Sequence, residues 1–152
     1  MYIITKKKVF ALSLMIFSLF SMSLAQPPSH DPTNIVKDGG RYWIFTTGEG
    51  IWHMSADNPD FNNWRSEGGI FSSGSWPNWI HDYVPGFEGH FWAPGIIYMN
   101  NKWHVYYSCS TFGSQTSAIG LVTASSLADG DWEDQGMVVY SNNSWDVNAI
   151  DA

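Results

Sequence analysis

The feature that most limits the possible fold is an internal repeat of about sixty residues. Residues 35–47, IVKDGGRYWIFTT, are matched 61 positions later by residues 96–108, IIYMNNKWHVYYS. In both copies, two runs rich in β-forming residues flank a turn, which is Asp-Gly-Gly in the first copy and Asn-Asn in the second. Gly and Asn tolerate the positive φ angles of tight turns. Each copy is therefore predicted to be a β-hairpin.

The repeat continues beyond the hairpins after a slip in register. Residues 51–56 resemble residues 119–124 at an offset of 68, and Trp64 matches Trp132 at the same offset. Each copy is predicted to hold about four short strands, and no stretch has the periodicity and caps of a helix. A β-sandwich also has short strands and frequent turns, but it gives no reason for a strand-by-strand match. The repeat favours an all-β propeller, in which such a unit is one blade.

A propeller closes with about four to eight blades, and this sequence extends over two blades and the start of a third. We therefore expect residues 26–152 to be the N-terminal part of a larger propeller domain. As a truncated piece it would leave blade faces unburied, so it is expected to be neither stable nor active alone.

Positions that match in the repeat are expected to converge. The innermost strand of each blade lines the central channel, so matching residues gather at one mouth. Asp31 and Trp92 each lie four positions before a hairpin copy, and Asp151 follows Trp92 by 59 positions. Two carboxylates that flank a bound sugar are the requirement of glycoside hydrolysis. The alternative for Asp31 is a turn-forming or capping aspartate before Pro32, which spacing alone leaves open.

The first 25 residues have the pattern of a secretory signal peptide. Three lysines precede a short apolar run at residues 9–20, and Ser23-Leu24-Ala25 fits a cleavage site. The alternative is an N-terminal membrane anchor, for which the run is short. Removal leaves four basic against 14 acidic residues, so the net charge falls from −7 to −10. An exported protein, extracellular or periplasmic, is expected, and its acidity excludes nucleic acid and favours a neutral partner.

The aromatic residues and the single cysteine also bear on fold and function. All nine Trp lie after residue 25, where they can pack between strands or stack on sugar rings. The single cysteine, Cys109, lies in an apolar run. A buried, unreactive thiol is expected there rather than a nucleophile.

Five motifs carry a family resemblance through their order and spacing. They are His30-Asp31-Pro32, PGFEGHFWAP at residues 85–94, SCSTFGS at residues 108–114, SAIGL at residues 117–121 and NAID at residues 148–151. Together they resemble family 43 glycoside hydrolases, and among these the endo-1,5-α-L-arabinanases. The resemblance implies a five-bladed propeller, monomeric when complete, that hydrolyses arabinan with inversion. The alternatives are an exo-acting arabinofuranosidase or β-xylosidase of the same family, and a non-catalytic carbohydrate-binding propeller.

The resemblance also implies roles for individual residues. Asp31 would be the general base that activates water, and Asp151 the aspartate that orients the catalytic acid and tunes its pKa. Five further residues would contact the substrate: Trp92 and Phe112 as aromatic platforms, with His30, Gly113 and Asn148. The family's general acid is a glutamate on a later blade. Four glutamates here match no acid motif and are read as surface or loop residues: Glu49, Glu67, Glu88 and Glu133.

The sequence departs from the family pattern at two positions. Gly95 follows the Trp-Ala-Pro motif, where the family often has Asp, and Ala152 follows Asp151, where it usually has Pro. The family's central metal, commonly calcium, relies on a histidine further along the propeller. No residue of this chain is therefore assigned as a metal ligand, including His53, His81, His90 and His104, and no other cofactor is assigned.

Overall fold

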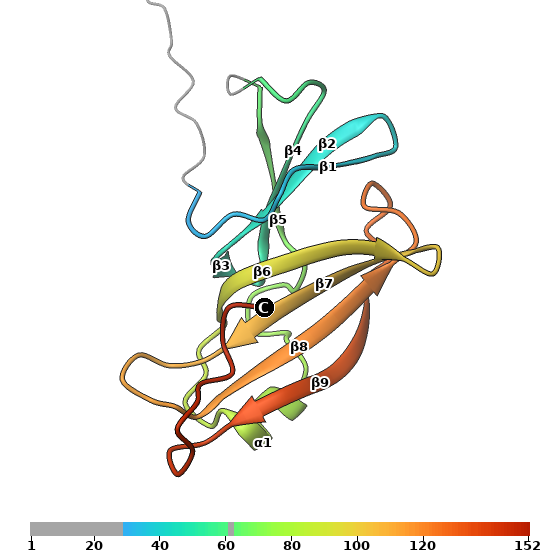
Figure 1. Ribbon diagram of the computed structural model, residues 1–152. Helices are drawn as coiled ribbons and strands as arrows, with labels where there is room; N and C mark the ends of the chain where they lie inside the picture. Colours follow the sequence, from blue (N-terminus) through green and yellow to red (C-terminus); the bar gives the residue numbers. More distant parts are fainter. Residues whose placement is uncertain (1–28, 61–62) are drawn as a thin grey trace, which may run out of the picture.

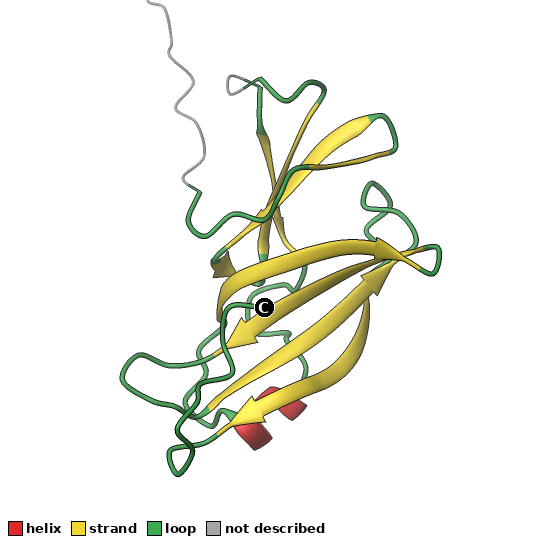
Figure 2. Cartoon of the chain, viewed as in Figure 1, coloured by secondary structure: helices red, strands yellow, loops and turns green. Residues whose placement is uncertain are grey.

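Two antiparallel sheets make up most of the computed structural model, which describes residues 29–60 and 63–152 (Figures 1 and 2). The predicted signal peptide, residues 1–25, lies outside the described residues. The first sheet has the order β1 (Val36–Asp38), β2 (Arg41–Thr46), β4 (Trp52–Ala56) and β5 (Arg65–Gly69). The second has the order β3 (Gly48–Glu49), β6 (His90–Met99), β7 (Lys102–Cys109), β8 (Ser117–Ala124) and β9 (Glu133–Ser141).

Both predicted hairpins are present. Strands β1 and β2 pair around Gly39 and Gly40, whose φ angles are 56° and 80°. Strands β6 and β7 pair around Asn100 and Asn101, whose φ angles are 51° and 60°. The turn residues differ between the copies, but they supply the same left-handed backbone that a tight hairpin needs.

The four strands expected in each copy are also present. Strands β1, β2, β4 and β5 match β6, β7, β8 and β9 in order, and neighbours in each sheet follow the chain. This up-and-down connection is that of a propeller blade rather than the Greek key of a sandwich. The two-residue strand β3 was not predicted. It pairs Gly48 with Phe91 and Glu49 with His90, and it thereby joins the first repeat to the second sheet.

The expectation that no segment is helical was wrong at one place. Helix α1 (Trp79–Tyr83) has five residues, lies between the two repeats and packs beneath β8 and β9 (Figure 1). Its Ile80 is fully buried. A helix this short leaves no periodic pattern in a window of about 11–18 residues. Within the described part of the chain, no helix is long and apolar enough to cross a membrane.

Aromatic side chains pack the two sheets together. Phe71, just after β5, lies with its ring centroid 5.5 Å from that of Phe91 on β6, and Trp132 packs perpendicular to Phe45 of the first sheet at 5.8 Å. A hydrogen bond also crosses between the repeats, because Asp38 Oδ2 accepts from the backbone amide of Leu127 at 2.8 Å. Apolar packing and the hydrogen bond between Leu127 and Asp38 therefore hold the two repeats together.

Cys109 is fully buried on β7 and makes no disulfide. Burial raises the pKa of its thiol well above the usual range. The expectation of a buried thiol is confirmed, and the raised pKa keeps it in the unreactive protonated form.

His53 occupies an aromatic site between the sheets. Its ring stacks on Phe45 with centroids 5.2 Å apart and meets the edge of Trp132 at 6.4 Å. Only 7% of the residue is exposed, and its Nδ1 has no hydrogen-bond partner among the described residues. Burial lowers its pKa below the ordinary value of 6.5, against the opposing effect of the nearby Glu67 charge. The ring is therefore neutral when the protein is folded at neutral pH.

This lowered pKa predicts an acid-sensitive stability. The unfolded chain binds a proton at His53 more readily than the folded chain, so the contribution of His53 is complete above pH 6.5 and decreases as the pH falls below that value. His53→Phe keeps an aromatic ring without the titration. Denaturant unfolding at several pH values should show a smaller loss of unfolding free energy in His53→Phe than in the wild type. An unchanged slope in His53→Phe would contradict this assignment.

Candidate active site

A cavity of about 440 Å³ opens beside the start of β6, and residues of both the first described segment and the C-terminal segment line it. Its lining residues are His30, Asp31, Thr47, His90, Trp92, Phe112 and Asp151. Five of the seven site residues predicted from the sequence are therefore brought together from distant parts of the chain. The two carboxylates and the indole share one cavity, as the repeat indicated.

The carboxylate of Asp31 is held at the end of β2. The segment before β1 runs along β2, because Thr47 N donates to His30 O at 2.9 Å and Thr33 N donates to Phe45 O at 2.8 Å. Oδ2 of Asp31 accepts from Thr47 Oγ1 at 3.0 Å and lies 2.7 Å from His30 Nδ1. These partners are side chains, whereas a turn-forming aspartate would accept from nearby backbone amides. The side chain remains 46% exposed, so water can reach it.

Thr47 links this carboxylate to the second sheet. Its hydroxyl donates to Asp31 and also accepts from the backbone amide of Ala93 on β6 at 2.9 Å. One side chain therefore fixes Asp31 relative to the strand that carries Trp92. Sequence reasoning missed Thr47, and the signal that could have found it was its match to Ser108 in the repeat.

Ser108 repeats this arrangement one unit later. Its fully buried hydroxyl accepts from the backbone amide of Asp151 at 3.0 Å. Because Thr47 and Ser108 match at the 61-residue offset, each repeat ends its second strand with a hydroxyl that holds a backbone amide of the following segment. The residues held, Ala93 and Asp151, have φ angles of 31° and 60°, and Asp31 has 45°. The hydroxyls thus stabilise an unusual backbone at the cavity.

The structure corrects the predicted equivalence of Asp31 and Trp92 by one residue. His30 bonds to Thr47 through the backbone, and Trp92 pairs with Ser108, so His30 matches Trp92. Asp31 therefore matches Ala93. The register of β6 and β7 shifts between Trp92 and Gly95. The offset between matching residues therefore changes by one just before the hairpin. Trp92 lines the cavity beside Ala93, the residue that matches Asp31.

Two aromatic rings form one wall of the cavity. Trp92 and Phe112 lie with their centroids 4.8 Å apart and their planes inclined by 39°. Phe112 is 90% exposed, the highest value among the exposed large hydrophobic residues of the described chain. The faces of such rings suit the apolar face of a sugar. We call Trp92 and Phe112 the aromatic ridge.

Two predicted contact residues do not line the cavity. Gly113 has a φ of 78° in the turn after Phe112. Asn148 accepts from Ser141 Oγ at 3.3 Å, and the same hydroxyl accepts from Ala149 N at 2.9 Å. Both residues shape the loops that carry lining residues, and their contact with substrate stays a prediction. His90, in contrast, lines the cavity although no role was assigned to it.

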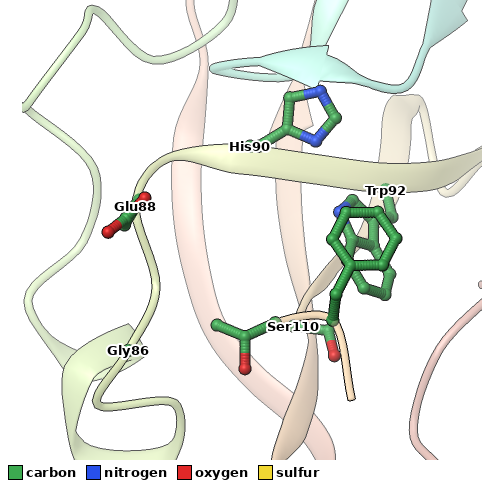
Figure 3. A pocket seen from close by; sticks show the side chains of 7 residues that line it. Gly86, Glu88, His90, Trp92 and Ser110 are labelled. Atoms are coloured by element: carbon green, nitrogen blue, oxygen red, sulfur yellow. The ribbon is translucent and has the colours of Figure 1, made fainter. Parts of the chain in front are cut away.

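A second cavity of about 390 Å³ adjoins the first (Figure 3). It is lined by Gly86, Glu88, His90, Trp92, Ser110, Thr111 and Phe112. Glu88 is an exposed loop residue, as expected, but it belongs to this cavity wall. The other three glutamates are exposed on strands β3, β5 and β9. Glu67 pairs with Arg41 at 2.7 Å, and Glu133 pairs with Lys102 at 2.8 Å.

The two departures from the family pattern lie against each other. A Cβ atom added at Gly95 would come within 2.6 Å of the carbonyl oxygen of Ala152. A side chain at position 95 would therefore require the segment after Asp151 to move. The glycine allows the chain to cross β6 closely beside the cavity.

The residues present do not fit a metal centre. Among residues 29–60 and 63–152, no group of three or more His, Cys, Asp or Glu side chains could hold a metal ion. The calcium ion implied by the family resemblance therefore has no ligand set in the described chain, and no chemical step below passes through it.

Comparisons with known proteins identify the family of this chain. The model of the glycosyl hydrolases family 43 matches residues 25–152. The extracellular endo-alpha-(1->5)-L-arabinanase 1 of Bacillus subtilis (strain 168) is 40% identical over 126 residues, which cover 80% of this chain and 38% of that protein. The extracellular exo-alpha-(1->5)-L-arabinofuranosidase ArbA of Cellvibrio japonicus (strain Ueda107) is 38% identical over 146 residues, which cover 93% and 40%.

A solved structure shows the same likeness. The structure of Cellvibrio cellulosa alpha-L-arabinanase complexed with arabinohexaose has a TM-score of 0.74 and 37% identity, covering 83% of this chain and 40% of that one. The chain spans about two fifths of the length of the curated relatives. The family match, by contrast, extends over all the residues that form both sheets and both cavities. The chain belongs to family 43 of the glycosyl hydrolases.

Proposed function

We propose that this chain is part of a secreted enzyme that hydrolyses 1,5-α-L-arabinofuranosidic linkages within arabinan, with inversion at the anomeric carbon. The observation that carries the proposal is the meeting of Asp31 and Asp151 in one cavity beside the aromatic ridge. The names of the relatives, which are extracellular arabinan-degrading proteins, support the substrate and the exported location.

Asp31 is proposed to act as the general base. Thr47 and His30 hold its Oδ2, and Oδ1 has no hydrogen-bond partner among the described residues, so that it can accept a proton. Asp31 takes a proton from water as the water oxygen bonds to the anomeric carbon. The glycosidic C–O bond breaks, and a general acid protonates the departing oxygen. Inversion needs the two carboxyl groups about 6.5–9.5 Å apart, which leaves room for the water.

Asp151 is proposed to orient that acid and tune its pKa. The Ser108 hydroxyl fixes its backbone, and its side chain lines the cavity. Among the described residues that line this cavity, the basic ones are His30 and His90. The acid itself is proposed to be a glutamate from a further part of the propeller, since none of the glutamates of this chain lines the cavity that holds Asp31. The complete protein is proposed to be a monomeric five-bladed propeller, and the calcium at its axis would be held by residues of the later blades.

A neutral polysaccharide is the proposed partner. The region after residue 25 has four basic and 14 acidic residues, a balance that repels nucleic acid and acidic polysaccharides. The aromatic ridge offers apolar faces to the sugar, while Asp31 and the histidines offer polar groups for its hydroxyls. This combination of ring faces and a few polar groups is typical of small-molecule sites.

Replacing the proposed base tests the function. In the complete enzyme, Asp31→Asn should lower kcat on debranched arabinan by about 10²–10⁴-fold, the usual contribution of a general base, with little change in KM. Asp129→Asn, at an exposed carboxylate away from the cavity, is the matched control and should keep full activity. Full activity of Asp31→Asn would show that another group activates the water.

Product analysis separates the endo-acting enzyme from its nearest alternative. One relative is named as an exo-acting arabinofuranosidase and another as an endo-arabinanase, so both modes of action are tested. An endo enzyme releases mixed oligosaccharides early in the reaction, whereas an exo enzyme releases a single product throughout. Binding of arabinan without any turnover by the complete protein would instead indicate a carbohydrate-binding propeller.

The double role of Thr47 predicts a positioning effect. Thr47→Val removes the hydroxyl that holds Asp31 and the Ala93 amide but keeps the shape of the side chain. Loss of a hydrogen bond to a charged group costs about 1.5–3 kcal/mol, so kcat should fall about tenfold to a hundredfold while KM changes less. Thr47→Ser restores the hydroxyl and should recover most of the activity. Equal activity of the Val and Ser variants would show that the hydroxyl does not position the base.

A further inference from the structure

Two segments that line the candidate active site lie at the same end of the second sheet (Figure 1). Residues 110–116 connect β7 to β8 and carry Phe112, and we call them the Phe112 loop. Residues 148–151 lie beyond β9 and end with Asp151, and we call them the Asp151 segment. Both named side chains line the cavity of about 440 Å³. The spacing of the loop and the segment therefore sets the spacing of the aromatic ridge and a carboxylate.

Ser141 lies where the loop and the segment meet. It is the last residue of β9, is 1% exposed and pairs with Ser117, the first residue of β8. Its hydroxyl donates to Gln115 O at 2.7 Å and accepts from Ala149 N at 2.9 Å. The same oxygen lies 3.3 Å from Asn148 Oδ1. One buried hydroxyl, which can donate and accept at once, therefore bonds the Phe112 loop and the Asp151 segment.

The loop and the segment each have a further anchor. Asn143, in the turn after β9, accepts from Gln115 N at 2.9 Å through its Oδ1. Ser108 accepts from Asp151 N at 3.0 Å. Ser141 differs from both because it contacts the loop and the segment together. Its bonds to them span 26 and 8 residues of the chain, so neither is a local turn contact.

An oxygen atom that bonds two backbone groups fixes the distance between them. Hydrogen bonds weaken steeply when they lengthen or bend, so the loop and the segment cannot move apart without loss of one bond. Because Ser141 is buried, removal of its hydroxyl leaves both backbone groups without this partner. The positions of Phe112 and Asp151 are therefore linked through Ser141.

We propose that Ser141 is a positioning residue for hydrolysis. Its hydroxyl holds the Phe112 loop and the Asp151 segment in one arrangement, so that the aromatic ridge and the Asp151 carboxylate face the same sugar. Ser141 lines neither cavity, and it acts through Gln115 and Ala149. The inference rests on the proposed function, in which Asp151 tunes the pKa of the catalytic acid.

The pH profile of kcat/KM for the complete enzyme tests this role, since its two limbs report the base and the acid. The titratable residues that line the cavity are His30, Asp31, His90 and Asp151. The negative charge of Asp151 raises the pKa of a nearby carboxylic acid. Ser141→Ala releases Ala149 and loosens the Asp151 segment, so the alkaline limb should shift to lower pH. The acidic limb, which reports Asp31 held by Thr47, should stay in place.

The rate and two further variants sharpen the test. In Ser141→Ala, kcat should fall about tenfold, equivalent to about 1.4 kcal/mol. Asn143→Ala removes the bond to the Gln115 amide and leaves the Asp151 segment held, so KM for arabinohexaose should rise several-fold while the alkaline limb stays in place. Thr123→Val is the matched control. It removes a buried hydroxyl, bonded to Gln135 Nε2 at 3.1 Å, at the other end of β8, and should keep kcat, KM and the pH profile.

Conservative replacement keeps the inference open to refutation. Ser141→Cys retains the size and a weak donor, so it should shift the alkaline limb in the same direction but less, and it carries the test if Ser141→Ala does not fold. A folded Ser141 variant with the kcat and both limbs of the parent would overturn the positioning role. A lower kcat with an unshifted alkaline limb would also overturn it, because the hydroxyl would then support only the fold. Failure of the parent enzyme to hydrolyse arabinan would instead overturn the proposed function.

Discussion

The site depends on one hydroxyl group that makes two hydrogen bonds. Thr47 donates to the Asp31 carboxylate and accepts from the Ala93 amide, so it joins the first repeat, the carboxylate and the next strand. Ser108 repeats the second of these bonds with Asp151. Because the repeat places a hydroxyl at the same point of each unit, residues far apart in sequence are brought to a common cavity. The repeat thus determines the fold and also brings the residues of the candidate active site together.

The backbone at this cavity is unusual in a way that suits a functional site. Asp31, Ala93 and Asp151 have positive φ angles, which cost non-glycine residues about 1–3 kcal/mol each when strained. The hydroxyls of Thr47 and Ser108 lie at these positions and offset part of that cost. The result is that both carboxylates are presented from segments outside the strands, whereas on a strand pleating would alternate them with buried residues.

Features with a local signal could be predicted from the sequence, and features that arise from packing could not. The Gly-Gly and Asn-Asn turns predicted the hairpins, and the repeat predicted the four strands and the meeting of Asp31 with Asp151. Helix α1 is too short to show a period. The irregularity before Gly95 displaced the predicted match by one residue, because a shift of register has no marker in a two-copy repeat. Thr47 was missed because its importance lies in contacts with distant segments.

The convergence of Asp31 and Asp151 on one sugar is the central claim, and a crystal structure of the complete Asp31→Asn enzyme with a bound arabino-oligosaccharide tests it most directly. The account predicts a furanose ring that contacts residues 31 and 151 and lies against Trp92, with the chain continuing past Phe112. An oligosaccharide bound elsewhere on the protein, with residues 31 and 151 in contact with solvent alone, would contradict it.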